Sequence, residues 1–185
     1  MLLGLVGVSG VGKTYFKEKI VQELGFQAVN TIRTREKRIG EENGKTGLFK
    51  TEEELVQLKE EGKIIYDFKV FGNTYAYLKN EIITEKNMIF EMHYTMINDW
   101  KKIRPDIKTI YIFPQDLEMA KQKVQEREMS IPKLKERISE MTKQYNEVCK
   151  DKNLQAMFDY IVYNNYDKES EKEITEIVKT MLNEK

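Results

Sequence analysis

Gly7-Val8-Ser9-Gly10-Val11-Gly12-Lys13-Thr14 is the stretch that decides the fold, because it fits the pattern G-x-x-x-x-G-K-[ST] of phosphate-binding loops. The apolar residues 2–6 before it predict a buried strand. Behind it, apolar residues recur at helical spacing until Gly25 offers a stop: Phe16, Ile20, Val21 and Leu24. A strand, a glycine turn and a helix N-terminus direct backbone N–H groups and the helix dipole at one point. The pattern therefore predicts an anion site rather than a glycine-rich turn that merely contains a lysine.

The side chains of this loop add the chemistry of a nucleotide site. Glycines let the backbone wrap around a phosphate, Lys13 supplies a positive charge, and the Thr14 hydroxyl can ligate Mg²⁺. We expect nucleotide phosphates to be bound by Gly7, Ser9, Gly10, Val11, Gly12, Lys13 and Thr14.

The composition favours one soluble domain. A chain of 185 residues with 40% hydrophobic content can bury one core. Basic and acidic residues balance at 31 each, so we expect neither a nucleic acid nor a membrane as partner. Cys149 is the one cysteine, which excludes an internal disulfide and favours a reducing compartment. Residues 1–8 are apolar but lack a basic leader and are too short to span a bilayer, so we expect a cytoplasmic protein.

The rest of the chain alternates between strand and helix patterns. Short apolar runs predict strands at residues 26–29, 87–92, 108–113 and 160–163. Helices are predicted after Thr51, through Ile97 and Trp100, after Asp116, through residues 134–148 and through residues 174–182. A charged segment, residues 125–135, separates the third of these helices from the fourth. Residues 63–77 are typical of a hairpin with a Gly72-Asn73 turn.

Strands that alternate with helices predict an α/β fold with a doubly wound parallel sheet, whose ligands bind at the carboxyl ends of the strands. The hairpin does not fit that alternation and is interpreted as part of an inserted subdomain. A second local feature is the run of residues 33–38, with three arginines and one lysine against one glutamate. It fits either a phosphate-binding patch or a solvated loop, and charge alone favours the loop.

Taken in order, these features resemble the guanylate kinase family over nearly the whole chain. Residues 31–41 are similar to the family's Arg-x-x-Arg-x-Gly-Glu signature, and residues 71–75 to its Gly-Asn-Tyr-Tyr turn. Residues 158–164 are similar to its last strand, which ends in an asparagine near the adenine of ATP. Arg127 and Arg137 stand at the positions of the family's flap arginines.

The resemblance implies a P-loop kinase that uses ATP and Mg²⁺ to phosphorylate a nucleoside monophosphate, with GMP or dGMP as the default acceptor. It implies one domain over residues 1–185, with a core of residues 1–30, 87–125 and 138–185, an acceptor-binding insertion of residues 31–86 and a lid of residues 126–137. Catalytic roles pass to Lys13, Arg127 and Arg137, and an ATP-binding role to Asn164. Acceptor-binding roles pass to Thr31, Arg35, Arg38, Glu41, Tyr66, Tyr75, Tyr77 and His93. Within that set, Arg35, Arg38 and Tyr75 match the residues that grip the acceptor's phosphate.

The departures from the family concentrate in the base-reading positions. Tyr66 stands where an acid normally reads guanine, and Tyr77 where a small hydroxyl residue is usual. A further phosphate-binding tyrosine is replaced by Gly47. Asp67 is an alternative acid, although a shift of one residue turns a side chain to the other face of a strand.

Glu91 and His93 stand where the central strand of the family carries two aspartates. Glu91 is the expected metal-binding partner of Thr14, acting through water, and it is also a second alternative for the missing guanine-reading acid. His93 fits equally an acceptor-binding residue at the end of the strand and a hydrogen-bonded core histidine.

Two other functions remain as alternatives. One is a related P-loop kinase that acts on a different phosphorylated acceptor, because phosphate recognition is better supported than base recognition. The other is a non-catalytic interaction module, which would need neither Lys13 nor Thr14. The expected partners are ATP and a phosphorylated small molecule, with the chain acting as a monomer or a homodimer.

Overall fold

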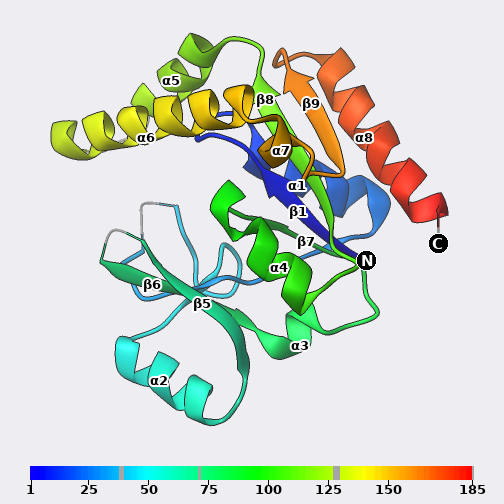
Figure 1. Cartoon of the computed structure of the whole chain (residues 1–185). Coiled ribbons are helices and arrows are strands. Elements are labelled where there is room, and N and C mark those ends of the chain that lie inside the picture. Colours follow the sequence, from blue (N-terminus) through cyan, green and yellow to red (C-terminus); the bar gives the residue numbers. More distant parts are fainter. Residues whose placement is uncertain (38–39, 71, 127–129, 185) are drawn as a thin grey trace. The chain divides into compact units, whose positions relative to one another are not determined.

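The computed structural model describes residues 1–37, 40–70, 72–126 and 130–184 (Figure 1). Arg38 and Arg127, two of the expected site residues, therefore lie outside the described residues. The chain divides into two compact units, which are described separately. The larger unit contains Met1–Phe26 and Ile89–Lys185, and the smaller unit contains Gln27–Met88.

A five-stranded sheet with the order β2-β7-β1-β8-β9 forms the centre of the fold. Its strands are β1 (Leu2–Val6), β2 (Gln27–Ala28), β7 (Met88–Glu91), β8 (Lys108–Pro114) and β9 (Tyr160–Asn164). Strand β8 pairs in parallel with both β1 and β9, with Leu5 opposite Ile110 and Ile112 opposite Val162. The division between the two units falls at β2 and at the first residue of β7. The doubly wound parallel α/β sheet predicted from the sequence is confirmed.

Helices of the larger unit pack around this sheet (Figure 1). They are α1 (Lys13–Leu24), the 3₁₀ turn η1 (Tyr94–Met96), α4 (Ile97–Ile103), α5 (Leu117–Gln125), α6 (Ile131–Lys150), α7 (Lys152–Gln155) and α8 (Lys168–Asn183). One apolar core joins α1, α5, α6 and α8 to the strands, through residues that include Leu5, Phe16, Ile112, Val124, Met141 and Val178. The predicted cap of α5 is confirmed, because the Asp116 carboxylate accepts a hydrogen bond from the N–H of Glu118 at 2.8 Å.

The start of α6 differs from the prediction. The sequence suggested a charged segment through residue 135, whereas the helix begins at Ile131, one residue after its N-cap Ser130. Pro132 lies in the first turn, where its missing N–H has no helical partner to lose and its φ angle suits a helix. Residues 131–137 of the expected lid are therefore the beginning of a 20-residue helix.

The smaller unit has its own four-stranded sheet with the order β4-β3-β6-β5. Its elements are β3 (Ile32–Arg33), β4 (Leu48–Phe49), α2 (Glu52–Glu60), β5 (Ile64–Val70), β6 (Asn73–Leu78) and α3 (Lys79–Ile82). Strands β5 and β6 pair antiparallel, which confirms the predicted hairpin. Strands β3 and β4 were not predicted, because a two-residue strand contains no periodic pattern.

The two faces of this small sheet have different characters. One face carries Ile32 and Ala76, which pack against Leu55 of α2 in a separate apolar cluster. Side chains alternate between faces along a strand, so Arg33 and Tyr75, which pair directly, share the opposite face.

Helix α2 begins with the predicted cap at Thr51, which forms a capping box with Glu54.

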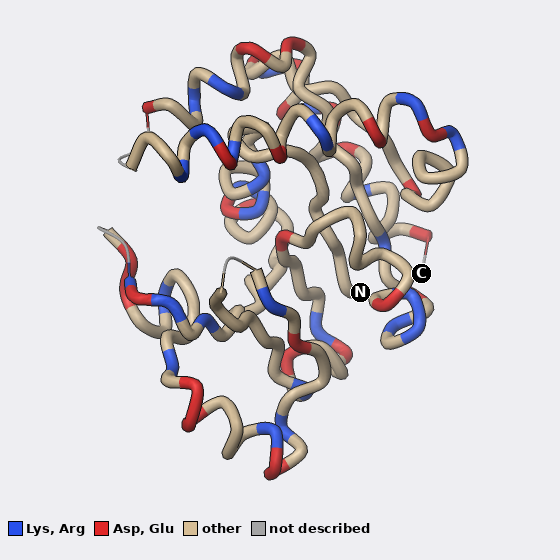
Figure 2. Tube along the Cα trace, turned by 60° about the vertical axis from the view of Figure 1, so that its left-hand side comes forward, with Lys and Arg blue, Asp and Glu red and all other residues tan. Residues whose placement is uncertain are grey.

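Lys, Arg, Asp and Glu residues occur along the backbone trace of both units (Figure 2). Across the described ranges, every helix is too short or too polar to cross a bilayer.

Candidate active site

The phosphate loop connects β1 to α1 in the larger unit. Gly10 and Gly12 adopt left-handed φ angles of 78° and 93°. A Cβ atom on Gly10 would lie 2.3 Å from the carbonyl oxygen of Ala120, so only glycine fits there. Gly12 is the N-cap of α1 and offers no side chain to the N–H groups of the first turn. The positive end of the helix therefore faces the loop without an acidic cap.

Lys13 is folded over the same loop. Its ammonium group donates hydrogen bonds to the carbonyl oxygens of Gly7 at 2.8 Å and Val8 at 2.9 Å. These contacts hold the positive charge of Lys13 against the backbone of the loop.

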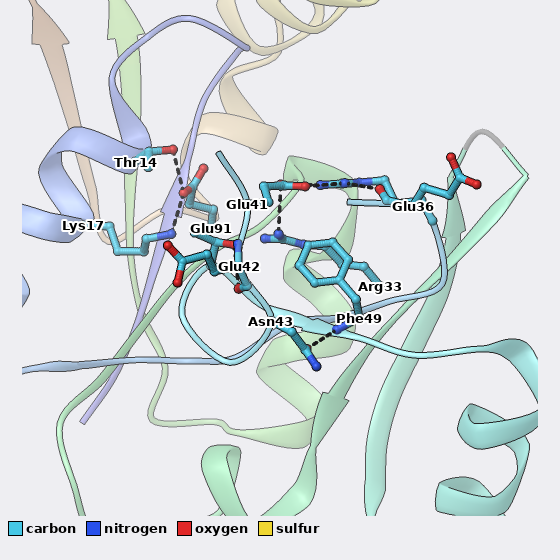
Figure 3. Close-up of polar contacts among 11 residues, drawn as sticks. Thr14, Lys17, Arg33, Glu36, Glu41, Glu42, Asn43, Phe49 and Glu91 are labelled. Atoms are coloured by element: carbon cyan, nitrogen blue, oxygen red, sulfur yellow. Dashed lines mark hydrogen bonds and ion pairs between the residues drawn. The ribbon is translucent and has the colours of Figure 1, made fainter. Parts of the chain in front are cut away.

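Thr14 and Glu91, the two expected metal-binding residues, are in contact (Figure 3). The Thr14 hydroxyl and the Lys17 ammonium each donate to Oε1 of Glu91 at 2.9 Å. Burial alone would raise the pKa of Glu91, but the charges of Lys17 and Lys13 and these two hydrogen bonds together lower it. The carboxylate is therefore ionised at neutral pH, and Lys17, which sequence reasoning missed, helps to keep it so.

Asn164 and Arg137 also contact the loop. The buried amide of Asn164, at the end of β9, donates to the carbonyl oxygen of Val11 at 3.0 Å. Arg137 of α6 donates from Nη1 to the Ser9 hydroxyl at 3.1 Å. The larger unit thus brings together the expected nucleotide-binding residues on the loop, Asn164 and one of the two expected flap arginines.

Tyr166 is a loop contact that sequence reasoning missed. Its backbone N–H donates to Oδ1 of Asn164 at 2.7 Å, and its hydroxyl donates to the carbonyl oxygen of Gly10 at 3.3 Å. Tyr166 has a φ of 59°, a conformation that non-glycine residues rarely adopt. Tyr166 is 156 residues from Gly10, and no local sequence pattern predicts a contact over that separation.

His93 also lies in the larger unit. Nδ1 of its ring lies 2.8 Å from the Thr95 hydroxyl, and the ring packs on Tyr94 with a centroid distance of 4.5 Å. Its buried Nε2 has no hydrogen-bond partner among the residues that the structure describes, and Glu140 approaches it at 3.9 Å. Burial, reinforced by the charge of Lys13, lowers the pKa of His93 to about 4. His93 is therefore neutral at pH 7.

In the smaller unit, two side chains of the arginine-rich loop, residues 33–37, bind the carboxylate of Glu41 (Figure 3). Arg35 donates from both terminal nitrogens to the two carboxylate oxygens, each at 2.6 Å, in a bidentate pair. Arg33 donates to the same carboxylate at 3.3 Å. Both guanidinium groups lie over the ring of Phe49, 5.6 Å and 5.4 Å from its centroid. The hydrogen bond to Glu41 raises the pKa of Arg35, with a smaller contribution from the Tyr75 hydroxyl.

The expected base-reading tyrosines form an aromatic row on one face of the β5–β6 hairpin. The rings of Tyr66 and Tyr77 stack at 6.5 Å, and those of Phe68 and Tyr75 at 5.4 Å. Tyr66 pairs directly with Tyr77, and Phe68 with Tyr75, so all four side chains share that face.

Asp67 lies on the other face of the hairpin. It pairs with Ala76 in the sheet, and its carboxylate binds Lys59 of α2 at 2.7 Å. A one-residue shift that would bring Asp67 beside Tyr75 is therefore absent from the described hairpin, and the Asp67 alternative is not supported. Thr31, another expected acceptor-binding residue, lies beside β4 and accepts a hydrogen bond from the N–H of Leu48 through its carbonyl oxygen at 3.0 Å.

Comparisons with known proteins agree on one family. The family model for guanylate kinase matches residues 2–183. A guanylate kinase from Wolbachia pipientis wMel is 28% identical over 190 residues, which cover 96% of this chain and 89% of that protein. Another, from Wolbachia sp. subsp. Brugia malayi (strain TRS), is 29% identical over 191 residues, 96% of this chain and 91% of that protein.

A solved structure shares the fold. The crystal structure of guanylate kinase from Anaplasma phagocytophilum matches with a TM-score of 0.71 at 18% identity, covering 99% of this chain and 84% of that one. Because the family model covers nearly the whole sequence and the phosphate loop is intact, the chain belongs to the guanylate kinase family, the ATP-dependent nucleoside monophosphate kinases that convert GMP to GDP.

Proposed function

We propose that this chain transfers the γ-phosphoryl group of ATP to the phosphate of GMP or a related nucleoside monophosphate, and releases a nucleoside diphosphate and ADP. The observation that carries the proposal is the contact between Thr14 at the start of α1 and the ionised Glu91 at the end of β7, directly behind an intact phosphate loop. An interaction module that binds no nucleotide has no need of this arrangement.

On the donor side, the loop N–H groups and Lys13 bind the phosphates of ATP. Thr14 and Glu91 supply a hydroxyl and a carboxylate, the hard oxygen ligands that suit Mg²⁺. No cluster of three or more metal-binding side chains occurs in the described part of the chain. That fits Mg²⁺, which characteristically binds through one or two protein ligands together with substrate phosphates and water. When bound, the ion neutralises charge on the phosphates of ATP.

On the acceptor side, Arg35 is the principal phosphate ligand. Its planar guanidinium group forms a bidentate pair with the Glu41 carboxylate, and the same two donors can bind two oxygens of a phosphate. The incoming phosphate therefore competes with the Glu41 carboxylate for the same donors. In the smaller unit, Arg38 and the hydroxyl of Tyr75 complete this phosphate site, and Thr31, Tyr66 and Tyr77 bind the rest of the acceptor. The acceptor-binding role expected of His93, in the larger unit, is part of the same proposal.

Catalysis in this proposal consists of positioning and electrostatic stabilisation. Two negatively charged phosphates must approach, so the cationic side chains offset their repulsion before transfer. Arg137, already bound to Ser9 of the loop, stabilises charge on the transferring group, and Arg127 acts with it. The reaction needs neither a covalent enzyme intermediate nor a general base of unusual pKa.

The finer organisation is part of the same proposal. Residues 31–86 bind the acceptor, and residues 126–137 act as a lid that excludes water during transfer. The enzyme acts on free nucleotides in the cytoplasm, as a monomer or a homodimer.

The test is a reaction of the purified protein with ATP, Mg²⁺ and GMP. ADP release measured by a coupled assay, together with ³¹P NMR of the nucleotide product, should show equal amounts of ADP and GDP. Omitting the acceptor or chelating Mg²⁺ should abolish both products. ADP release that does not depend on an acceptor, or no reaction with any nucleoside monophosphate, would contradict the proposal.

A second acceptor class is favoured by one observation, the aromatic row in the base-reading positions. Tyrosines pair poorly with the N1 and N2 donors of guanine, whereas Arg35 binds any phosphomonoester. The same assay with other phosphorylated small molecules separates a guanylate kinase from a kinase with a different acceptor.

A further inference from the structure

We propose that Arg33 is an additional ligand of the acceptor's phosphate, and that it occupies the place of the phosphate-binding tyrosine that Gly47 replaces in this chain. This inference rests on the proposed function and adds a residue to its acceptor site. Arg33 lies two residues before Arg35, outside the arginine signature of the family.

Strand register places Arg33 on the phosphate-binding face of the smaller unit. Arg33 in β3 pairs with Tyr75 in β6 on one side and with Phe49 in β4 on the other. Residues that are directly opposite in adjacent strands project from the same face. The side chain of Arg33 therefore shares a face with the Tyr75 hydroxyl and the Phe49 ring, while its neighbour Ile32 is buried in the apolar cluster behind the sheet.

Gly47 leaves room for this guanidinium. A Cβ atom on Gly47 would lie 3.0 Å from both Cζ and Nη1 of Arg33. Such a distance is tighter than ordinary van der Waals contact, so a side chain at position 47 and Arg33 in its present conformation compete for one volume. Gly47 also has a φ of 151°, which a residue with a side chain rarely adopts. The change from tyrosine to glycine and the presence of Arg33 are therefore spatially linked.

The charges around Arg33 favour an anion. Arg33 and Arg35 share the single carboxylate of Glu41, so these three side chains carry one net positive charge. The contact from Arg33 is a single one at 3.3 Å, longer than the two 2.6 Å contacts from Arg35. The ring of Phe49 makes cation–π contacts with both guanidinium groups. Arg33 is thus the more weakly held of two cations that face the same acid.

A phosphate that replaces the Glu41 carboxylate in some of these contacts would therefore be bound by the guanidinium groups of both Arg33 and Arg35. A guanidinium donates through several N–H groups in a fixed plane, whereas the lost tyrosine donated one hydroxyl. We expect Arg33 to make acceptor binding depend strongly on the phosphate, which suits a site whose base-reading residues are altered.

The experiment compares Arg33→Ala, Arg33→Gln and Arg33→Lys with the wild-type protein. Binding of GMP and of guanosine is measured by isothermal titration calorimetry, and KM for GMP and for ATP by steady-state kinetics. We expect Arg33→Ala to weaken GMP binding at least tenfold and to leave guanosine binding and KM for ATP unchanged. Arg33→Lys should recover part of the loss, because it restores the charge without the fork.

Lys45→Ala is the matched control, because it removes one positive charge from the same loop at an exposed side chain paired with Glu42. It should leave GMP binding unchanged. Arg33→Gln keeps a polar side chain beside Glu41, so it tests the same point if Arg33→Ala does not fold. Equal losses of GMP and guanosine affinity would show that Arg33 only supports the fold, and would overturn the inference.

Arg35→Ala separates this inference from the proposed function. If Arg35→Ala weakens GMP binding and Arg33→Ala does not, the inference about Arg33 is wrong and the acceptor site stands. If neither substitution affects GMP binding, the assignment of this loop to the acceptor is itself wrong.

Discussion

The phosphate loop and the arginine loop both bind phosphate in the proposed reaction, yet they are built differently. In the phosphate loop, the ligands are backbone N–H groups held by glycines such as Gly10, whose φ of 78° admits no side chain. In the arginine loop, the ligands are side chains held by other side chains, with Arg33 and Arg35 both bound to Glu41.

The difference decides how each site can change. A backbone site depends on the conformation of a few consecutive residues, so a substitution there removes the site. A side-chain site can exchange one donor for another if a new group reaches the same point. In our proposal, Gly47 and Arg33 are such an exchange, and the tyrosines at positions 66 and 77 alter base reading while phosphate binding is retained.

The largest effect is expected at the phosphate loop. Lys13→Ala should lower kcat/KM on the order of 10³-fold, because it removes the charge that stabilises the transferring phosphates. The melting temperature by circular dichroism should remain close to that of the wild type. Lys179→Ala, at an exposed position on α8, is the control and should be fully active. A folded Lys13→Ala variant with normal turnover would contradict the role of the phosphate loop in binding ATP.

The next effect concerns the arginine loop. Arg35→Ala removes a charge-assisted bidentate contact worth about 2–3 kcal/mol, so kcat/KM for GMP should fall by tens-fold or more. KM for ATP should hardly change, and Arg38→Ala should act in the same direction. Arg104→Ala removes an arginine that is paired with Asp106 in the larger unit and should change neither parameter. If Arg35→Ala weakened ATP and GMP equally, the loop would not be specific to the acceptor.

A smaller effect is expected in base selectivity. Unpaired guanine donors cost about 1–3 kcal/mol each, so the wild-type kcat/KM for GMP should exceed that for AMP, IMP, CMP and UMP by less than about a hundredfold. Tyr66→Glu restores an acid on the sheet face that carries Tyr75. It should raise the ratio of kcat/KM for GMP to kcat/KM for AMP by about tenfold. Asp67→Asn lies on the opposite face and should leave the ratio unchanged. A wild-type preference for GMP above a hundredfold would show that other groups read the base.

The smallest effect is a pH dependence of stability from His93, the one histidine of the chain. Its pKa is about 4 in the folded protein against 6.5 ordinarily, so the unfolded chain binds more protons between these values. The contribution of His93 to the free energy of unfolding is therefore fully present above pH 6.5 and is lost as the pH drops towards 4. Since the side chain is 37% exposed, we expect a loss of about 1 kcal/mol.

Melting temperatures at pH 7.5, 6.0 and 5.0 measure this dependence, with His93→Asn as the comparison. The substitution should flatten the curve in this window, because Asn does not titrate. A wild-type curve that is already flat would mean that His93 protonates as freely in the folded protein as in the unfolded chain.

Long, regular patterns were predictable from the sequence, and short or distant ones were not. The strands of the large sheet, the hairpin and the caps at Thr51 and Asp116 were predicted, because each has a signal within a few residues. Strands β3 and β4 and helices α3 and α7 were missed, because these short elements do not lie within longer apolar runs or a periodic apolar pattern. The contact of Tyr166 with the phosphate loop was missed because it joins residues that are far apart in the chain.

The sequence by itself determined the phosphate loop, since its conformation depends on three closely spaced glycines, Gly7, Gly10 and Gly12, between a strand and a helix. Only the tertiary structure decided that Glu91 meets Thr14, because the two are brought together by neighbouring strands and lie 77 residues apart. It also decided which face carries Tyr66 and which carries Asp67, since strand register sets the direction of each side chain. Likewise, the pairing of β3 with β6 places Arg33 beside Tyr75, because the hydrogen bonds between strands align residues that are distant in the chain.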